Sequence, residues 1–324
     1  MMGNSRKKIA LITLGLFIVG LLGAVALLNS PLLHGPQSNK SAGSKNATPQ
    51  AMSTSAATQT LGTQRDMVLP YDQMPGAAQS SIKVAVDGEE IFVEKYKDIN
   101  YARFAFRGTA QITITSPNAA SYTISPKSYQ LQPTMKQNTL TFALNQPRKL
   151  ILQGNDEKLF LFADAPEENA PALGDHNVID VTKYASDRTG NKIQTAQIQQ
   201  AIDDASKTQG IVYFPQGKYV TGTLKMKSNM SLYLSSGALL SGSGNAQDTA
   251  EHFLLFQDVQ NSKLYGRGTI DLHGMELRRT AGSSGRVKII RTINAKKYCP
   301  ARRGSARLWL LDRASGSFGW REGQ

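Results

Sequence analysis

The sequence predicts an all-β protein in which a small β-sandwich is followed by a parallel β-helix, behind an N-terminal transmembrane helix. The transmembrane helix is predicted by an unbroken apolar run over residues 9–28. The sandwich is predicted by short alternating runs over residues 82–165, because period-two alternation is typical of half-buried strands. The β-helix is predicted by strand-like segments in residues 175–296 that recur after about 20 to 30 residues, as the coils of a solenoid do.

The N-terminal segment has the pattern of an export signal. Residues 1–8 contain Arg6, Lys7 and Lys8, and the apolar run that follows is long enough, at about 1.5 Å per residue, to span roughly 30 Å of hydrocarbon. Basic residues ahead of the span place the N-terminus in the cytoplasm. We therefore expect an exported protein held by an uncleaved signal anchor, with its later domains outside the cytoplasm. Residues 24–26, Ala-Val-Ala, could instead serve as a cleavage site, which would make the protein secreted.

Residues 29–80 change in composition to Ser, Ala, Thr, Gln and Asn, with scattered Pro and almost no apolar periodicity. Such a segment cannot bury enough apolar surface to offset the entropy of ordering its backbone. We expect a flexible linker there. The single cysteine, Cys299, excludes an internal disulfide and a cysteine-based zinc site.

The pattern of residues 82–165 predicts one antiparallel β-sandwich. Turn pairs such as Asp87-Gly88 and Gly154-Asn155 separate its alternating runs, and turns about every ten residues are typical of this architecture. The aromatic residues of the segment could form a platform for sugar stacking. Most of them lie on the inward phase of their strands, which favours a role in the core. These residues are Tyr96, Tyr101, Phe104, Phe106, Phe142, Phe160 and Phe162.

The formal net charge of +13 suggests a polyanionic partner, since clustered Lys and Arg neutralise phosphates or carboxylates. Much of the excess lies near the two ends of the chain, in residues 6–8 and in the arginines after residue 300. The middle is only mildly basic, and no aromatic residues interleave with a basic run, as a binder of single-stranded nucleic acid requires. This distribution argues against nucleic acid and leaves open a mildly basic groove for an acidic polysaccharide.

A short amphipathic helix is predicted over residues 193–206. Its apolar residues recur close to helical spacing, and the pattern ends before Gly210. The open first coil of a solenoid needs a cap over its core. Because the helix directly precedes the first β-helix strands, we expect it to cover that coil.

Residues 178–271 carry a series of short motifs in a fixed order. They are Val178-Ile179-Asp180-Val181-Thr182, Ser186-Asp187-Arg188-Thr189-Gly190, Ala201-Ile202-Asp203-Asp204-Ala205, the run from Gly210 to Tyr219, Gly222-Thr223-Leu224, Lys227-Ser228-Asn229, Leu232-Tyr233-Leu234, the run from Gly237 to Gly242, and Gly266-Arg267-Gly268-Thr269-Ile270-Asp271. In this order they resemble the start of the polygalacturonase (pectinase) family. The resemblance implies a right-handed parallel β-helix and an inverting glycoside hydrolase that cleaves pectic or related chains without a metal or other cofactor.

The sandwich carries a looser resemblance, which rests on residues 86–88, 101–106 and 159–163. These segments are similar to the N-terminal β-sandwich of some dextranase-like hydrolases. The resemblance leaves an α-glucan substrate as the lesser alternative to an acidic pectic chain.

The resemblance also implies where the catalytic groups would lie. The family supplies its two carboxylates from an Asn-x-Asp and an Asp-Asp motif, helped by Gly-His-Gly and by an Arg-Ile-Lys that grips the substrate, and all four come further along the helix than this chain extends. We therefore expect a truncated β-helix, and no catalytic, cofactor-binding or metal-ligating residue is assigned.

Three segments resemble these motifs only in part. The pair Asp203-Asp204 lies in the capping helix, where a solvated pair is expected. The triplet of residues 286–288, Arg-Val-Lys, comes two coils too early and opens a strand. His273 lacks the leading glycine of Gly-His-Gly, and Asp271 before it is expected to cap a turn. A structural role is favoured for each segment over a catalytic one.

The periodic pattern ends after Lys296. Both tryptophans, the cysteine and a cluster of arginines fall in residues 297–324. A basic interaction tail is one explanation. A frameshifted end is the favoured one, because residues 309–315 can be encoded so that a one-base shift gives Gly-Ser-Trp-Thr-Val-His-Leu, a string similar to one in polygalacturonase-family proteins.

Two functions follow from these observations. The first is a polysaccharide hydrolase of the polygalacturonase type, present here as a truncated chain that is inactive by itself. The second is a noncatalytic surface protein that binds glycan or mediates adhesion through the sandwich and a short β-helix.

Overall fold

The structure is a computed structural model, and it describes residues 67–96, 99–118, 121–249, 252–281, 288–296, 299–300, 309–312 and 317–318. The predicted transmembrane helix of residues 9–28 lies outside this part of the chain, together with residues 1–8 and most of the predicted linker. No helix among the described residues is long and apolar enough to cross a membrane.

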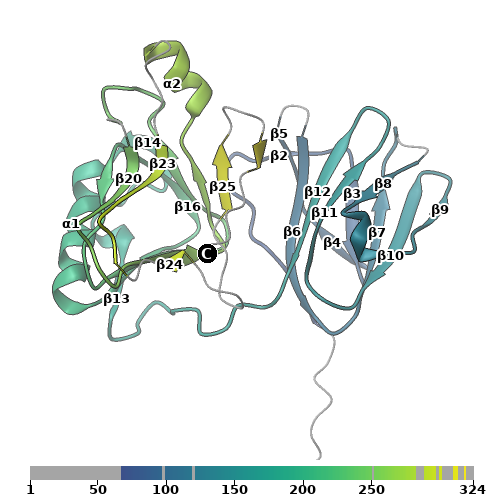
Figure 1. The fold of residues 1–324 in the computed structure, drawn as a ribbon, viewed down its shortest axis with the longest axis horizontal. Coiled ribbons are helices and arrows are strands. Elements are labelled where there is room, and N and C mark those ends of the chain that lie inside the picture. Colours follow the sequence, from purple (N-terminus) through teal and green to yellow (C-terminus); the bar gives the residue numbers. More distant parts are fainter. Residues whose placement is uncertain are drawn as a thin grey trace, which may run out of the picture. The chain divides into compact units, whose positions relative to one another are not determined.

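Two sheets form the predicted β-sandwich (Figure 1). The first has the order β2-β5-β6-β12-β11-β8, with β1 paired to β6, and the second has the order β4-β3-β7-β10-β9. All pairs are antiparallel except β6 with β12, which run parallel. The strands are β1 (Met67–Pro70), β2 (Ala78–Gln79), β3 (Lys83–Val86), β4 (Glu89–Ile91), β5 (Val93–Tyr96), β6 (Ile99–Arg107), β7 (Ala110–Thr115), β8 (Thr123–Ser125), β9 (Thr134–Lys136), β10 (Thr139–Leu144), β11 (Arg148–Gln153) and β12 (Lys158–Asp164).

The linker prediction was wrong for residues 67–79. Strand β1 pairs with β6 from Met67 to Pro70, and β2 pairs with β5. Val68 packs against the sandwich core. The sequence pattern does not indicate these strands because they add to the edge of a sheet that longer strands form. An edge strand can pair without an alternating apolar pattern of its own.

The aromatic residues of the sandwich divide between two apolar clusters. Phe104, Phe106 and Phe142 are buried between the two sheets, as predicted. In contrast, Tyr101, Phe160 and Phe162 face away from that core and form a second buried cluster with Met74 and with Leu239 of the β-helix. Tyr96 packs against this second cluster. The burial of these rings removes the sugar-stacking platform that the sequence left open.

The β-helix is formed by three parallel sheets. The β15 sheet has the order β13-β15-β18-β21-β24, the β16 sheet has the order β14-β16-β19-β22-β25-β26, and the β17 sheet has the order β17-β20-β23. Only β25 and β26 are antiparallel among these pairs. The strands are β13 (Val178–Asp180), β14 (Thr189–Ile193), β15 (Ile211–Phe214), β16 (Gly217–Thr221), β17 (Leu224–Lys225), β18 (Ser231–Leu234), β19 (Ala238–Gly242), β20 (His252–Gln257), β21 (Lys263–Gly266), β22 (Thr269–Asp271), β23 (Lys288–Ile293), β24 (Cys299–Pro300), β25 (Trp309–Asp312) and β26 (Ser317–Phe318).

The repeat seen in the sequence corresponds to stacked coils. Val212, Leu232 and Leu264 lie in register on the β15 sheet and are buried in one core. Ile289, which the sequence pattern placed in the same series, lies on β23 of the β17 sheet. Inward residues of all three sheets are apolar, so the period alone did not distinguish one sheet from another.

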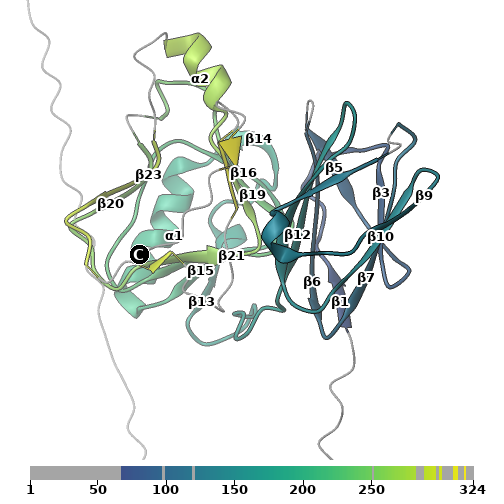
Figure 2. The ribbon, with the colours of Figure 1, turned by 45° about the vertical axis from the view of Figure 1, so that its right-hand side comes forward.

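The predicted cap is helix α1 (Thr195–Thr208), which lies beside β15 (Figure 2). Ile198, Ala201, Ile202 and Ala205 face the β-helix core and are fully buried. A second helix, α2 (Gly274–Ala281), follows β22 and was not predicted.

The structure differs from the expectation that residues 297–324 lack the coil pattern. β24, β25 and β26 are described there, and β24 and β25 pair in parallel with β21 and β22. A short segment can extend a sheet through backbone hydrogen bonds alone, which leave no periodic signal in the sequence. The frameshifted origin of this segment stays a prediction.

Candidate functional site

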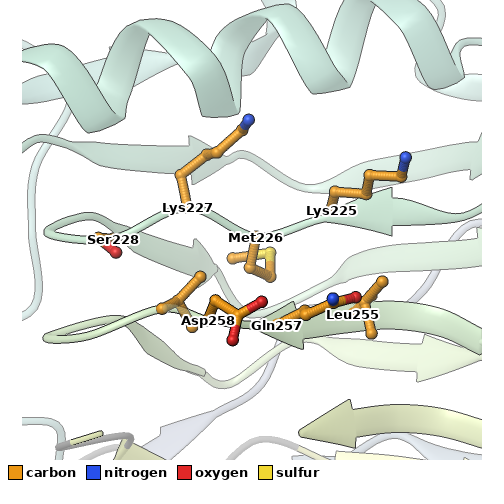
Figure 3. Close-up of a pocket in the computed structure, with 8 residues that line it drawn as sticks. Lys225, Met226, Lys227, Ser228, Leu255, Gln257 and Asp258 are labelled. Carbon is orange, nitrogen blue, oxygen red and sulfur yellow. The ribbon is translucent and has the colours of Figure 1, made fainter. Parts of the chain in front are cut away.

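A groove of about 360 Å³ lies on the β17 sheet, where two successive coils present their side chains (Figure 3). One side comes from β17 and the turn after it, and the other comes from β20 and its turn. The lining residues are Lys225, Met226, Lys227, Ser228, Leu255, Gln257, Asp258 and Val259.

The two sides of the groove are held together by backbone and turn hydrogen bonds. Lys225 pairs with Leu255 in the parallel ladder, and Met226 N donates to Leu255 O at 2.8 Å. At the turns, Asn261 Nδ2 donates to Asn229 Oδ1 at 3.0 Å, and both residues have positive φ. Because Asn tolerates the left-handed conformation better than most side chains, stacked asparagines can repeat the same turn in successive coils.

Two lysines give the groove its charge. Residues two apart on an extended chain point to the same face, and Figure 3 shows Lys225 and Lys227 projecting together toward α1. Met226 between them points into the core and is 3% exposed. Arg291 follows in register with Leu255 on β23, so a third cation continues the row that begins at Lys225.

The acidic pair of α1 is partly exposed, and its two members have different neighbours. Asp203 Oδ1 lies 3.6 Å from Lys227 Nζ, at the edge of the groove. Asp204 instead accepts hydrogen bonds from Lys207 at 2.8 Å and from the Tyr184 hydroxyl at 3.1 Å. The hydrogen bond from Lys207 is the main cause that lowers the pKa of Asp204. A carboxyl with a lowered pKa is a poor proton donor at neutral pH.

His273 and Asp271 form a hydrogen-bonded turn. His273 N donates to Asp271 Oδ1 at 3.0 Å, and His273 Nε2 lies 2.9 Å from Ser241 Oγ. Glu276 Oε2 lies 4.0 Å from His273 Nδ1. The order serine, histidine and carboxylate resembles a nucleophilic triad, but Ser241 is fully buried and Asp271 is 1% exposed, so a polysaccharide has no access to them. These contacts support the predicted role of Asp271 as a turn cap.

The Arg-Val-Lys triplet of residues 286–288 lies only partly within the described residues. Residues 286 and 287 are outside the described residues, and Lys288 opens β23. Within the described residues, no group of three or more His, Cys, Asp and Glu side chains could hold a metal ion.

The groove therefore presents two ammonium groups that can contact an anion. Its lysines were not selected from the sequence. The pattern Lys225-Met226-Lys227 is a usable signal, because a buried apolar residue between two charged ones marks an outward face on a strand.

Residues 178–263 match the family model described as rhamnogalacturonase A/epimerase, pectate lyase-like. An exo-poly-α-D-galacturonosidase from Dickeya chrysanthemi is 32% identical over 119 residues, which cover 30% of this chain and 20% of the relative. An iota-carrageenase from Zobellia galactanivorans is 25% identical over 103 residues, which cover 29% of this chain and 21% of the relative. Among solved structures, Dex49A from Penicillium minioluteum has a TM-score of 0.41 and 12% identity, over 72% of this chain and 60% of that chain.

The chain thus spans about a fifth of the length of these two curated relatives. Its matched segment begins at β13 and ends at the start of β21, so it includes α1 and both strands that line the groove. Over this segment the chain resembles the polygalacturonase-like, pectate lyase-like β-helix proteins, as its motifs predicted.

Proposed function

We propose that this protein is of the polygalacturonase-like, polysaccharide-hydrolase type and that its described residues hold a polysaccharide against the outward face of the β17 sheet. The observation that carries this proposal is the lysine-lined groove between β17 and β20, which lies within the segment that resembles those proteins. One of the relatives is named for poly-α-D-galacturonide and another for iota-carrageenan. A polymeric substrate suits a solenoid, because successive coils repeat similar surfaces along one axis.

The described residues are proposed to bind the chain without cleaving it. Inverting hydrolysis needs a protonated and an ionised carboxyl group roughly 6.5 to 9.5 Å apart on opposite sides of the sugar. Asp204 is held ionised by Lys207, and Asp271 is buried in its turn. Asp203 and Asp258 belong to the groove region, but each is engaged by a neighbouring side chain, Lys227 and Asn294 respectively.

Export and membrane attachment through residues 9–28 complete the proposal. They are supported by the basic residues and the apolar run of the sequence. An exported position would place the groove where extracellular polysaccharide can reach it.

The second candidate is a noncatalytic protein that holds surface glycan or mediates adhesion. It is favoured by the same engagement of the described carboxylates. The two candidates share the groove, and both predict binding without cleavage by the described residues. They differ in whether the gene encodes the family's Asn-x-Asp and Asp-Asp motifs after residue 324.

The test uses the full chain, purified in a mild detergent, with polygalacturonate, rhamnogalacturonan and dextran. We expect at least one polysaccharide to bind in affinity electrophoresis and none to release new reducing ends. Turnover that is abolished by Asp258→Asn or Asp203→Asn would show that the groove cleaves its ligand. Absence of binding to all three would overturn the proposed function.

A further inference from the structure

We propose that Glu167 is a pH-sensitive latch for the connector, the segment of residues 165–177 that runs from the end of β12 to the start of β13. As a neutral acid, Glu167 fastens the connector to the outward face of the β15 sheet. As a carboxylate, with its proton lost to solvent, it lets the connector detach. The latch shares no residue with the groove on the β17 sheet, so it acts whatever that groove binds.

A row of stacked tyrosines on the β15 sheet receives Glu167. Tyr213, Tyr233 and Tyr265 are paired in register on successive strands, and their ring centroids lie 5.1 Å and 5.0 Å apart. They alternate with the core residues of these strands, so their rings face outward. Tyr233 is nonetheless only 4% exposed, and its hydroxyl donates to Glu167 Oε2 at 2.9 Å. Glu167 therefore fastens the connector to the middle of the row.

The surroundings of Glu167 suit a neutral acid better than a carboxylate. Among the described residues Tyr233 is the one hydrogen-bond donor to Glu167, and Glu167 Oε1 is buried without a donor. A buried carboxylate needs several donors or a paired cation to offset the loss of its hydration. Burial is accordingly the main cause that raises the pKa of Glu167.

The cation near Glu167 is already engaged by other groups. Arg267 Nη1 lies 3.3 Å from Asp164 Oδ2, and Arg267 Nη2 donates to Ala165 O at 2.8 Å. Arg267 therefore only partly offsets the charge of Glu167, and Asp164 repels it. Tyr71 faces the same charges, and its hydroxyl donates to Asp164 Oδ2 at 3.4 Å. An ionised Glu167 thus lacks a counter-ion of its own within the described residues.

The sign of the pH dependence follows from the raised pKa of Glu167. Its stabilisation of the closed connector is complete below the ordinary carboxyl pKa of about 4.5 and is lost as the pH rises through the raised value. Burial raises the pKa of all three tyrosine hydroxyls, that of Tyr265 to about 12, so these groups stay protonated throughout. The other titratable side chains of the connector, Glu168, Asp175 and His176, are exposed. The latch is therefore closed in acid and loosens toward neutral pH.

Hydrogen–deuterium exchange of the full chain in mild detergent, from about pH 4 to about pH 8, tests the latch. The native chain and Glu167→Gln are compared at each pH, so the pH dependence of the intrinsic exchange rate cancels. Gln keeps an oxygen that can accept from Tyr233, and it cannot ionise. We expect the connector of the native chain to exchange as slowly as that of Glu167→Gln at the acid end and progressively faster than the variant as the pH rises.

Tyr233→Phe supplies a second measurement that a purely structural contact would not change. It keeps the ring but removes the hydrogen bond that lowers the pKa of Glu167. The midpoint of the pH-dependent exchange should therefore move to higher pH, whereas a structural contact would speed exchange by the same factor at every pH.

Glu168→Gln is the matched control. It makes the same charge change at the exposed neighbouring position, and its connector should exchange like that of the native chain at every pH. Slow exchange in β6 shows that each variant is folded. Glu167 is not a latch if the native chain and Glu167→Gln exchange alike throughout, if they differ by a constant factor, or if Glu168→Gln also removes the pH dependence.

Discussion

Gly266 shows how closely the coils of this β-helix approach one another. It ends β21 with φ at +119°, and a Cβ atom added there would lie 2.0 Å from the carbonyl oxygen of Leu234 in the preceding coil. That neighbour is backbone, and it is part of the ladder between β18 and β21. Glycine is therefore required at position 266 for two reasons. Its φ is unfavourable for other residues, and the preceding coil leaves no room for a side chain.

We expect Gly266→Ala to lower the free energy of unfolding by roughly 3 kcal/mol or more, since strain in φ and a backbone clash act together. Urea denaturation followed by circular dichroism measures the change. Gly88→Ala is the control, because Gly88 has φ of +86° but nothing within 4 Å of the added Cβ. Gly88→Ala should lower the free energy of unfolding only by the cost of the left-handed conformation, about 1 kcal/mol. Equal losses at the two sites would show that the coils yield to an added methyl group.

Glu167 is a carboxylic acid whose burial penalises its charge. Burial is the main cause that raises its pKa, and the hydrogen bond from Tyr233 at 2.9 Å and the nearby Arg267 only partly oppose it. A raised folded-state pKa stabilises the fold below the unfolded pKa, and that contribution is lost as the pH rises through the folded value.

We therefore expect Glu167→Gln to be more stable than the native protein at neutral pH. This advantage should be lost as the pH falls through the raised folded-state pKa, and none should remain below the ordinary carboxyl pKa of about 4.5. Gln retains an oxygen that can accept from Tyr233. Thermal melts from pH 3 to pH 8, with Glu168→Gln as a neighbouring exposed control, measure the difference. An advantage for Glu167→Gln that is independent of pH would contradict an origin in the burial of charge.

Helix α1 stabilises the first coil in two ways. Its apolar face closes the core, and Gln199 bonds to both backbone groups of Lys225 at the edge of the β17 sheet. A solenoid whose terminal coil is uncovered exposes both its core and the edges of its sheets.

Ile202→Ala should lower the stability of the protein by roughly 3 kcal/mol, because the side chain is fully buried and a cavity replaces it. Gln197→Ala, at an exposed position of the same helix, should change it by no more than about 0.5 kcal/mol. Chemical denaturation distinguishes the two. A small effect for Ile202→Ala would mean that α1 is not needed to close the core.

On the scale of the whole described molecule, the sandwich and the β-helix share a buried junction. Tyr101, Phe160 and Phe162 pack with Leu239. Around them, Arg103 Nη1 donates to Thr269 Oγ1 at 3.0 Å, and Arg267 Nη1 lies 3.3 Å from Asp164 Oδ2. Arg267 and Asp164 are 5% and 4% exposed. Such a junction couples the unfolding of the two parts.

We expect the native chain to show one calorimetric unfolding transition for its two folded parts. Asp164→Asn should lower the free energy of unfolding by roughly 3 kcal/mol, because the variant leaves the charge of Arg267 buried without its paired carboxylate. Asp204→Asn, at a solvated site, should leave the transition in place. Two independent transitions in the native chain, with only one shifted by Asp164→Asn, would show that the parts fold separately.

The sequence by itself determined the order of the parts and the class of each. Alternation located most strands of the sandwich, helical spacing located α1, and the motifs of residues 178–271 indicated the polygalacturonase-like β-helix. These features depend on residues that are close together in the chain, so the order of residues is enough to detect them. Residues 67–79 were missed because an edge strand requires only a free edge to pair with.

Only the tertiary structure decided which surfaces are free. Phe160 and Phe162 have the alternation of core residues, yet they are buried against the β-helix. Neither Lys225 nor Lys227 was predicted as a site residue, yet the ladder between β17 and β20 places them on one rim of a groove, and α1 brings Asp203 within 3.6 Å of Lys227. The physical reason is that burial and charge contacts depend on partners distant in sequence, which the periodicity of a single segment does not encode.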